Sequence, residues 1–241
     1  MTSSVLDNGI LSALPPEEWQ ALRPSLSSAR LVVDQVLVEA GDLSEHVYFI
    51  EQGLVCLLGS GGGRMAQVGM VGKEGMVGAL TLTSGLHSHN SAVVQVSGLA
   101  LRIPLGALRR HLESCPVLRE RCMEHAHFLL GEIIQAAVFS TYGTLEQRCA
   151  RWLVMADIRM DGESVPVTQE VVAGLLCARR PGVSTAIAHL QARGLIRAGR
   201  GRISVLDRHG LAAVAAGKLV EPWSARLAMN SPEIEGTALR D

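Results

Sequence analysis

Two adjacent arginines, Arg179 and Arg180, stand immediately before Pro181 in the segment VTQEVVAGLLCARRPGVSTAIAHLQARGLI. A guanidinium group can donate two parallel hydrogen bonds, which match O6 and N7 on the major-groove edge of guanine. Further along, Thr185 offers a methyl group that suits thymine and a hydroxyl that suits a phosphate. These residue types suit a surface that contacts DNA. Both arginines would also suit an ordinary solvated surface.

Two short helices joined by a turn are expected to position these side chains. Thr168 is a good N-cap for the first helix, residues 177–180 form the turn, Pro181 suits the first turn of the second helix, and Gly194 ends it. The apolar residues lie at helical spacing: Val172, Leu175 and Leu176 in the first helix, and Val183, Ile187 and Leu190 in the second. This pattern predicts a helix-turn-helix, whose second helix enters the major groove.

The face of the second helix that lies opposite its apolar residues is the face that would meet DNA. The residues expected to contact DNA in this motif are Thr168, Arg179, Arg180, Pro181, Ser184, Thr185 and Ala188. After Gly194, the segment LIRAGRGRISVL predicts a β-hairpin with Arg197, Arg200 and Arg202 at or near its tip. Such a hairpin is typical of a wing laid along a phosphate backbone.

The charge of the sequence is divided unevenly. Residues 144–215 carry a net charge of +4, residues 1–143 carry −4, and the tail from residue 216 carries −1. The positive part of the chain is where a polyanion would bind. By itself a charge of this size also fits a solvated surface.

The first hundred residues have a different texture. Pro15 and Pro16, followed by two glutamates, predict a short helix that opens the region 9–29. From residue 31 to 103, short valine-rich runs alternate with glycines, which predicts about eight strands joined by tight turns. We therefore expect an antiparallel β-roll.

After Pro104 the pattern becomes a long helical stretch that ends near Phe139, with a hinge at residues 140–143. Its apolar residues recur at spacings of three and four, and they include Leu118, Leu129, Leu130, Ile133, Ile134 and Ala137. Because this stripe is broad and contains small residues, we expect it to face a second copy of the chain as well as its own domain. The alternative is a helix that packs only on its own sheet.

The patterns together predict an α+β protein in four parts. These are a β-roll sensor domain over residues 1–105, a dimerisation helix and hinge over 106–143, a winged helix-turn-helix over 144–215, and a C-terminal tail over 216–241. Hydrophobic residues make up 48% of the chain and charged residues 19%, which is typical of packed globular domains.

Other classes of function lack their motifs. The sequence has no glycine-rich phosphate loop with lysine, no GxSxG and no HExxH, so we do not expect an enzyme. Its five cysteines form no CxxC pair, and we predict no cofactor and no metal site. Residues 1–14 do not have the pattern expected of a secretory signal, and no apolar stretch approaches the roughly 20 residues of a membrane span. We therefore expect a soluble cytoplasmic protein with no membrane partner.

The order of β-roll, long helix and winged helix-turn-helix resembles the Crp/Fnr superfamily of bacterial transcription regulators, over about residues 9–211. The segment GDLSEHVYFIEQGLV at residues 41–55 is similar to that family's early strands, and VTQEVVAGLLCARRPGVSTAIAHL matches its helix-turn-helix without a gap. By this resemblance Arg180 is the base-reading arginine. Pro181 and Thr185 depart from the residues of cyclic-AMP-responsive members, and Cys177 replaces a common turn glycine, so the resemblance identifies no operator sequence.

The resemblance implies a homodimer that binds a two-fold symmetric DNA site, acts with RNA polymerase and is controlled by a small-molecule effector or a redox state sensed in the β-roll. In this family a glutamate and an arginine hold the cyclic nucleotide. Here Ala79 and Asn90 take their places, so we expect no response to cyclic AMP or cyclic GMP, unless the alignment is shifted and Lys73 or His89 supplies the charge. The expected effector pocket comprises Gly78, Ala79, Leu80, Asn90, Ser91 and Ala92.

A regulator of the same fold that senses haem, a metal or a redox state is the alternative function. Cys122 and His125 lie three residues apart on the long helix and can share one ion, whereas His125 and His127 point about 200° apart. His87 and His89 lie close together in the β-roll sequence. We favour packed or solvated roles for these side chains.

Overall fold

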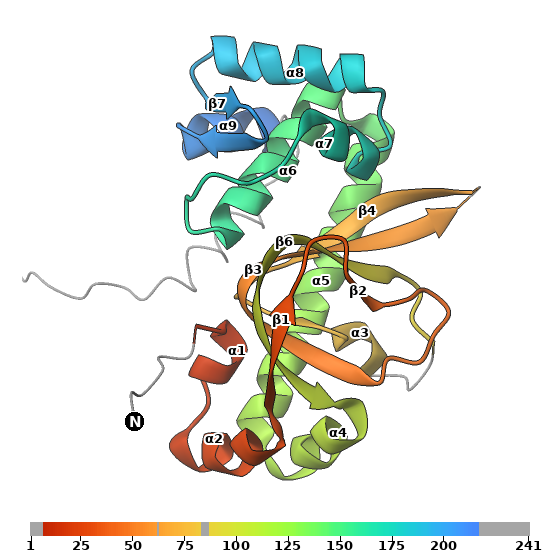
Figure 1. The fold of residues 1–241 in the computed structure, drawn as a ribbon, viewed down its shortest axis with the longest axis vertical. Coiled ribbons are helices and arrows are strands. Elements are labelled where there is room, and N and C mark those ends of the chain that lie inside the picture. The colour runs from red at the N-terminus through yellow and green to blue at the C-terminus, as the bar shows by residue number, and fades with distance from the viewer. Residues whose placement is uncertain (1–6, 62, 83–86, 217–241) are drawn as a thin grey trace, which may run out of the picture.

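The computed structural model describes residues 7–61, 63–82 and 87–216. Figure 1 shows two bodies arranged along one long helix, α5 (Pro116–Tyr142). The N-terminal body is a β-roll with small helices at its lower end, and the C-terminal body lies at the upper end of α5. The α+β class and the order of the parts are those predicted from the sequence, whereas the tail from residue 217 lies outside the described residues.

The β-roll contains six antiparallel strands within the described residues. They are β1 (Ser27–Leu31), β2 (Val36–Val38), β3 (His46–Gly61), β4 (Arg64–Val71), β5 (Met76–Val77) and β6 (Ser91–Pro104). The sheet runs in the order β1-β6-β3-β4, with β2 paired to β6 and β5 paired to β3. Four short helical segments complete this body: α1 (Gly9–Ser12), α2 (Pro16–Leu22), a 3-10 turn (Arg23–Ser25) and α3 (Ala79–Leu82).

Gly53 and Gly98, two of the glycines that separate the valine-rich runs, lie inside the longest strands and not at turns, and the described residues form six strands where about eight were expected. Gly53 in β3 has a φ of +94°, and a Cβ on Gly98 in β6 would stand 1.9 Å from the carbonyl oxygen of Gln52. The register between β3 and β6 shifts around this point. Because glycine lets the two backbones touch, each strand bends there and continues.

The helical stretch after the sheet is two helices rather than one. α4 (Leu105–Ser114) ends before Cys115, and α5 begins at Pro116, because proline suits the first turn of a helix and disrupts a helix interior. The buried carboxylate of Glu18 accepts hydrogen bonds from the backbone N–H groups of Val117 and Leu118, at 3.0 and 2.8 Å. Glu18 therefore caps α5 and ties α2 to its first turn.

The C-terminal body begins with α6 (Leu145–Arg159), where Thr144 and Gln147 form a capping box. The remaining elements are α7 (Gln169–Leu175), α8 (Arg180–Ala192), β7 (Ile196–Gly199), β8 (Arg202–Val205) and α9 (Arg208–Ala216). The helix α9 was not expected from the sequence. Its signals are Asp207, whose carboxylate accepts the N–H of Gly210 at 2.9 Å, and the buried Leu211.

An apolar core joins the two bodies. Leu54, Met70 and Val96 of the β-roll are buried together with Trp152 and Leu153 of α6. The burial of this apolar surface holds the C-terminal body against the sheet. No helix in the described part of the chain is both long enough and apolar enough to cross a membrane.

Candidate DNA-binding interface and sensor pocket

The helix-turn-helix is held together by a small apolar centre. The hydroxyl of Thr168 accepts the backbone N–H three residues later at 3.2 Å, and so caps α7. Val172 of α7 and Val183 and Leu190 of α8 are completely buried. In the turn, Cys177 has a φ of +49°, the left-handed conformation that glycine adopts most easily. This geometry fixes the crossing of the two helices and the direction of α8.

The outer face of α8 is exposed to solvent. Pro181, Thr185 and Ala188 are all exposed, as the helical spacing predicts. The side chain of Arg180, the first residue of α8, is 68% exposed and lies 3.4 Å from the carboxylate of Glu170. The hydroxyl of Thr185 donates to the Pro181 carbonyl oxygen at 3.1 Å. The hydroxyl of Thr185 therefore keeps its acceptor lone pairs, and the methyl group stays available, whereas the hydroxyl hydrogen is already used.

Two other expected contact residues lie differently. Arg179 is the N-cap residue of α8 and is exposed. Ser184 is half-buried, and its hydroxyl donates to Oε1 of Gln169 at 2.6 Å. Ser184 therefore ties α8 to α7 rather than facing outward.

The hairpin β7–β8 presents the three expected arginines. Gly199 pairs with Arg202, so Arg200 and Gly201 form the two-residue turn, and Gly201 has a φ of +74°. Arg200 is at the tip, Arg202 is next to it, and Arg197 lies nearer the base of the hairpin. All three arginines are exposed.

A groove of about 200 Å³ lies between the start of α8 and the hairpin turn. Its lining includes Thr168, Glu170 and Arg180 on one side and Gly199 and Gly201 on the other. The base-reading candidate and the wing therefore border the same depression. This arrangement suits a helix in the major groove with a hairpin beside it on the phosphate backbone.

The apolar stripe of α5 divides into an inner and an outer face. Leu118 and Leu129 are buried in the β-roll core and therefore form the part of the stripe that faces the chain's own domain. Ile133 is half-buried. The outer apolar residues are Met123, Leu130, Ile134 and Ala137, of which Leu130 is 49% and Ile134 53% exposed. Their spacing of seven, four and three residues is that of a coiled-coil seam.

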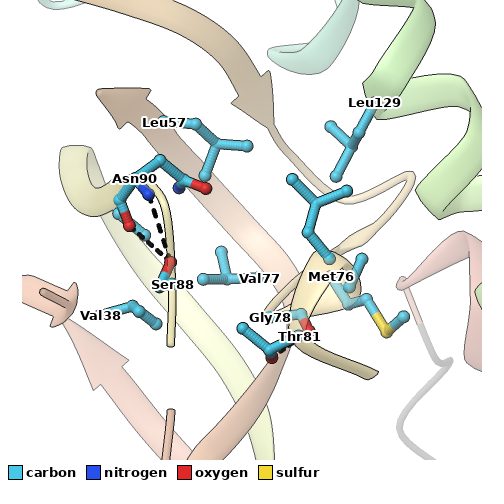
Figure 2. Close-up of a pocket in the computed structure, with 12 residues that line it drawn as sticks. Val38, Leu57, Met76, Val77, Gly78, Thr81, Ser88, Asn90 and Leu129 are labelled. Atoms are coloured by element: carbon cyan, nitrogen blue, oxygen red, sulfur yellow. Dashed lines mark hydrogen bonds between the residues drawn. The ribbon is translucent and has the colours of Figure 1, made fainter. Parts of the chain in front are cut away.

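Figure 2 shows a small space inside the β-roll, beneath α5. Its apolar lining consists of Val38, Leu57, Met76, Val77 and Leu129. Five of the six expected pocket residues also line it: Gly78, Ala79, Leu80, Asn90 and Ala92. The space measures about 20 Å³, which is enough for one water molecule. In this conformation the pocket is therefore nearly filled by its own side chains.

The polar side chains of this pocket carry no charge. The Thr81 hydroxyl donates to the Gly78 carbonyl oxygen at 2.8 Å, and the Ser88 hydroxyl donates to the Asn90 carbonyl oxygen at 2.7 Å, as the dashed lines in Figure 2 show. The sixth expected residue, Ser91, does not line the space; its hydroxyl accepts a backbone N–H at 3.1 Å.

The two side chains considered as replacement cations lie elsewhere. Lys73 is ion-paired to Asp161 of the C-terminal body, and His89 is exposed. Neither belongs to the described lining, which contains no lysine, arginine or histidine. The position expected for a phosphate-binding arginine is Asn90, whose amide donates to a neighbouring carbonyl oxygen at 3.4 Å.

The imidazole of His125 is buried against the turn between β4 and β5. Its Nε2 lies 3.1 Å from both the amide nitrogen and the carbonyl oxygen of Met76, so the tautomer decides whether it accepts or donates. Gly75 is so close that a Cβ there would stand 1.9 Å from the ring. Burial lowers the pKa of His125 to about 4, against the opposing effect of Glu74. The ring is therefore neutral at neutral pH.

Cys122, the other candidate metal ligand on α5, is also buried. It packs in the β-roll core, where burial raises the pKa of its thiol to about 12. A neutral thiol is a weak metal ligand. Among the described residues, no group of three or more His, Cys, Asp or Glu side chains is arranged to hold a metal ion. His87 and His89 are exposed.

A buried ion cluster connects the two bodies. Arg159 of α6, whose side chain is 1% exposed, donates to Oε1 of Glu74 and to Oε1 of Glu132, both at 2.7 Å. Burial raises the pKa of Glu132, and this effect outweighs the opposing pull of Arg159. The second carboxylate oxygens, Oε2 of Glu74 and of Glu132, have no hydrogen-bond partner in the described structure. No sequence pattern indicated this cluster, because its members lie far apart in the chain.

Comparison with known families identifies both bodies. Residues 30–115 match the cyclic nucleotide-binding domain family, and residues 147–214 match the Crp-like helix-turn-helix domain family. No match was found among curated proteins.

Solved structures of low sequence identity share the fold over nearly four fifths of this chain. FixK2 from Bradyrhizobium japonicum is 16% identical, with a TM-score of 0.66 over 78% of this chain and 96% of that one. The c-di-GMP-responsive global regulator CLP from Xanthomonas campestris is 15% identical, with a TM-score of 0.63 over 79% and 99%. A CRP-family transcriptional regulator from Thermus thermophilus is 20% identical, with a TM-score of 0.61 over 78% and 96%. At these identities the likeness concerns the fold.

Proposed function

Since the chain is a transcription regulator of the Crp/Fnr type, with a cyclic nucleotide-binding-like domain and a helix-turn-helix DNA-binding domain, we propose that it binds two-fold symmetric DNA as a homodimer. Arg180, Thr185 and Ala188 meet base edges, and Arg200 and Arg202 meet phosphates. The observation that carries this assignment is the groove whose two sides are the start of α8 and the turn of the wing. Arg180 lines one side of the groove, and the exposed Arg200 and Arg202 are next in the chain to glycines that line the other side, which suits a polyanion.

The test is selection of bound duplexes from a library of random sequence, using the full chain. The expected result is an inverted repeat whose half-sites lie about one helical turn apart. A variant that carries both Arg180→Ala and Arg200→Ala, which leaves the buried centre of the motif untouched, serves as the control and should enrich the repeat much more weakly, with the preference relaxed at one base pair of each half-site. Recovery of unrelated sequences by the wild-type protein would contradict the proposal.

The proposed dimer forms through the outer face of α5. Met123, Leu130, Ile134 and Ala137 leave apolar surface exposed on one side of the helix while its other side packs in the β-roll. A parallel pair of such helices buries this surface and places two helix-turn-helix motifs on the same side of the dimer.

The proposed control site is the pocket of the β-roll, and its effector is a small uncharged molecule. The described lining is mostly apolar with three uncharged polar side chains, so it offers no partner for a phosphate. A ligand must displace side chains to enter, because the present space fits one water molecule. As a DNA-binding regulator of this type, the protein would work in the cytoplasm beside RNA polymerase.

A further inference from the structure

A buried cation between two carboxylates attaches the C-terminal body to the rest of the molecule. Arg159 belongs to α6, Glu74 to the turn between β4 and β5, and Glu132 to α5. The cluster thus joins the DNA-binding body to two different parts of the sensor body. One guanidinium is hydrogen-bonded to both carboxylates, and each carboxylate keeps one oxygen without a hydrogen-bond partner among the described residues. Such an arrangement is strong only while Arg159 reaches both partners.

The turn that carries Glu74 is held by several neighbours. The Lys73 carbonyl oxygen accepts the N–H of Gly9 at 2.7 Å, and the Gly75 carbonyl oxygen accepts from the side-chain amide of Asn8 at 2.8 Å. Its own backbone leads directly into the segment Met76 to Ala79, which lines the pocket. A displacement of the pocket segment therefore moves Glu74.

Glu132 is carried by a different part of the molecule, the long helix α5. It lies one turn of α5 beyond Leu129, which lines the pocket, and close in the chain to Leu130 on the outer face of the same helix. The distance between Glu74 and Glu132 thus depends on how the pocket segment sits against α5. Arg159 spans that distance.

We propose that Arg159 is an interdomain latch, whose two carboxylate partners transmit the state of the β-roll pocket to the orientation of the DNA-binding body. This proposal extends the proposed function. Its test by DNA binding rests on that function, whereas its test by the docking of the two bodies does not. In the latched conformation the outer face of α8 and the wing are exposed at the end far from the β-roll (Figure 1). The latch therefore orders the DNA-binding body in a position that leaves its DNA-contacting surface free.

Trp152 gives a direct measure of docking. Its indole is 2% exposed, and its N–H donates to Oε1 of Gln67 in β4 at 2.7 Å, across the junction of the two bodies. The emission and acrylamide quenching of Trp152 are measured in the full chain with Trp19 and Trp223 replaced by phenylalanine. Arg159→Met should raise the open population by about a hundredfold or more, since breaking a buried ion pair is strongly destabilising, and quenching should rise with it.

Matched variants separate the latch from a general loss of stability. Arg208→Met breaks the pair with Asp157, which lies within the C-terminal body, and should leave Trp152 protected. Glu74→Gln keeps an acceptor for the backbone N–H of Gly72 but removes one charge from the cluster, and should raise quenching less than Arg159→Met does. Glu74→Gln also covers the case in which Arg159→Met does not fold. Wild-type quenching in both cluster variants would overturn the latch.

A second arm tests the link to the pocket and to DNA. Ala79→Val overfills a space that fits one water molecule, and should raise Trp152 quenching in the wild-type background but not further in Arg159→Met. Arg159→Met should also weaken binding to the selected duplex by roughly tenfold, because a loose domain must be ordered on binding. Additive effects of Ala79→Val and Arg159→Met, or unchanged DNA affinity, would overturn the coupling. If the wild-type protein bound no duplex, the proposed function would fail while the quenching results still decided the latch.

Discussion

In the proposed interface with DNA, Arg180 is the residue that contributes most to the recognition of base sequence. Its guanidinium is exposed at the first position of α8, and its neighbour in the structure is the equally exposed Glu170. Arg180→Ala should cost roughly 1 to 3 kcal/mol at the preferred site and relax the preference at one base pair of each half-site. Fluorescence anisotropy with the selected duplex and with duplexes changed at single positions measures both effects. Equal losses on selected and random DNA would reject the assignment.

Arg200 provides the comparison, because it stands at the wing tip. Arg200→Ala should weaken binding to all duplexes alike and lower the salt slope by about one counterion, as expected for a phosphate contact. A change in base preference in this variant would contradict the division of roles between α8 and the wing.

His125 makes stability depend on pH. Its pKa in the folded protein is about 4, below the ordinary value of 6.5, so the unfolded chain binds more protons between these values. The stability that the neutral ring of His125 contributes is fully present above pH 6.5. It is lost as the pH falls toward 4, and the free energy of unfolding decreases by on the order of 3 kcal/mol in all. Urea unfolding between pH 4.5 and 7.5 should show this slope, and His125→Gln should flatten it. The control is His89→Gln, at an exposed position, which should keep the dependence of the unfolding free energy on pH. The same dependence in His125→Gln would refute the assignment.

Single residues differed in how well the sequence predicted them. Exposure along α8 followed from helical spacing alone, so Pro181 and Thr185 lie where the pattern puts them. Arg159 could not be recognised from its neighbours in the chain, because its partners lie on other elements. Leu129 belongs to an apolar stripe on any reading, and only the packing of α5 shows that it points into the β-roll.

Among the elements, α5 carries the prediction about assembly. Leu130→Glu and Ile134→Glu each place a carboxylate in the proposed seam and should shift the protein toward monomers, because a desolvated unpaired charge costs several kcal/mol. Ile133 is a poorer test, since it is half-buried within its own chain. Sedimentation velocity measures the effect, with Arg110→Glu on the exposed side of α4 as control. Intact dimers in both seam variants would mean that copies associate elsewhere.

The start of α5 depends on a side chain from a distant element. Glu18→Ala removes the acceptor of two backbone N–H groups and should destabilise the protein by about 1.5 to 3 kcal/mol, as for hydrogen bonds to a charged group. Glu17→Ala, next to it and exposed, should change the unfolding free energy little. Urea denaturation distinguishes the two. Similar losses in both variants would show that the helix propensity of α2, not the cap, is responsible.

Element boundaries were predicted well where the chain marks them and poorly where the tertiary structure decides. Thr168 and Gly194 mark the helix-turn-helix locally, and both positions behave as expected. Glycine at a turn and glycine at a strand crossing look the same in a sequence, which is why Gly53 was misread. The break at Pro116 was visible as a residue, but an uninterrupted apolar pattern concealed it.

At the scale of the whole molecule, the described lining of the β-roll pocket lacks the charged side chains that would hold a cyclic nucleotide. Ala79 and Asn90 line the space where the resemblance places a glutamate and an arginine. Without the hydrogen bonds that a charged glutamate and a charged arginine would make, affinity for cyclic AMP should be lower by roughly two to four orders of magnitude. Isothermal titration calorimetry with cyclic AMP and cyclic GMP checks this expectation. A micromolar dissociation constant for either nucleotide would contradict this prediction.

The contact between the backbones at Gly53 and Gly98 gives the sensor an unusual mechanical character. A slip of β3 against β6 by one residue would drive a side chain into a carbonyl oxygen. The register of the two longest strands is therefore fixed at this contact. We therefore expect a change in the shape of the pocket to displace the segments that border the sheet, such as the turn at residues 72–75, rather than to shift the register of these two strands.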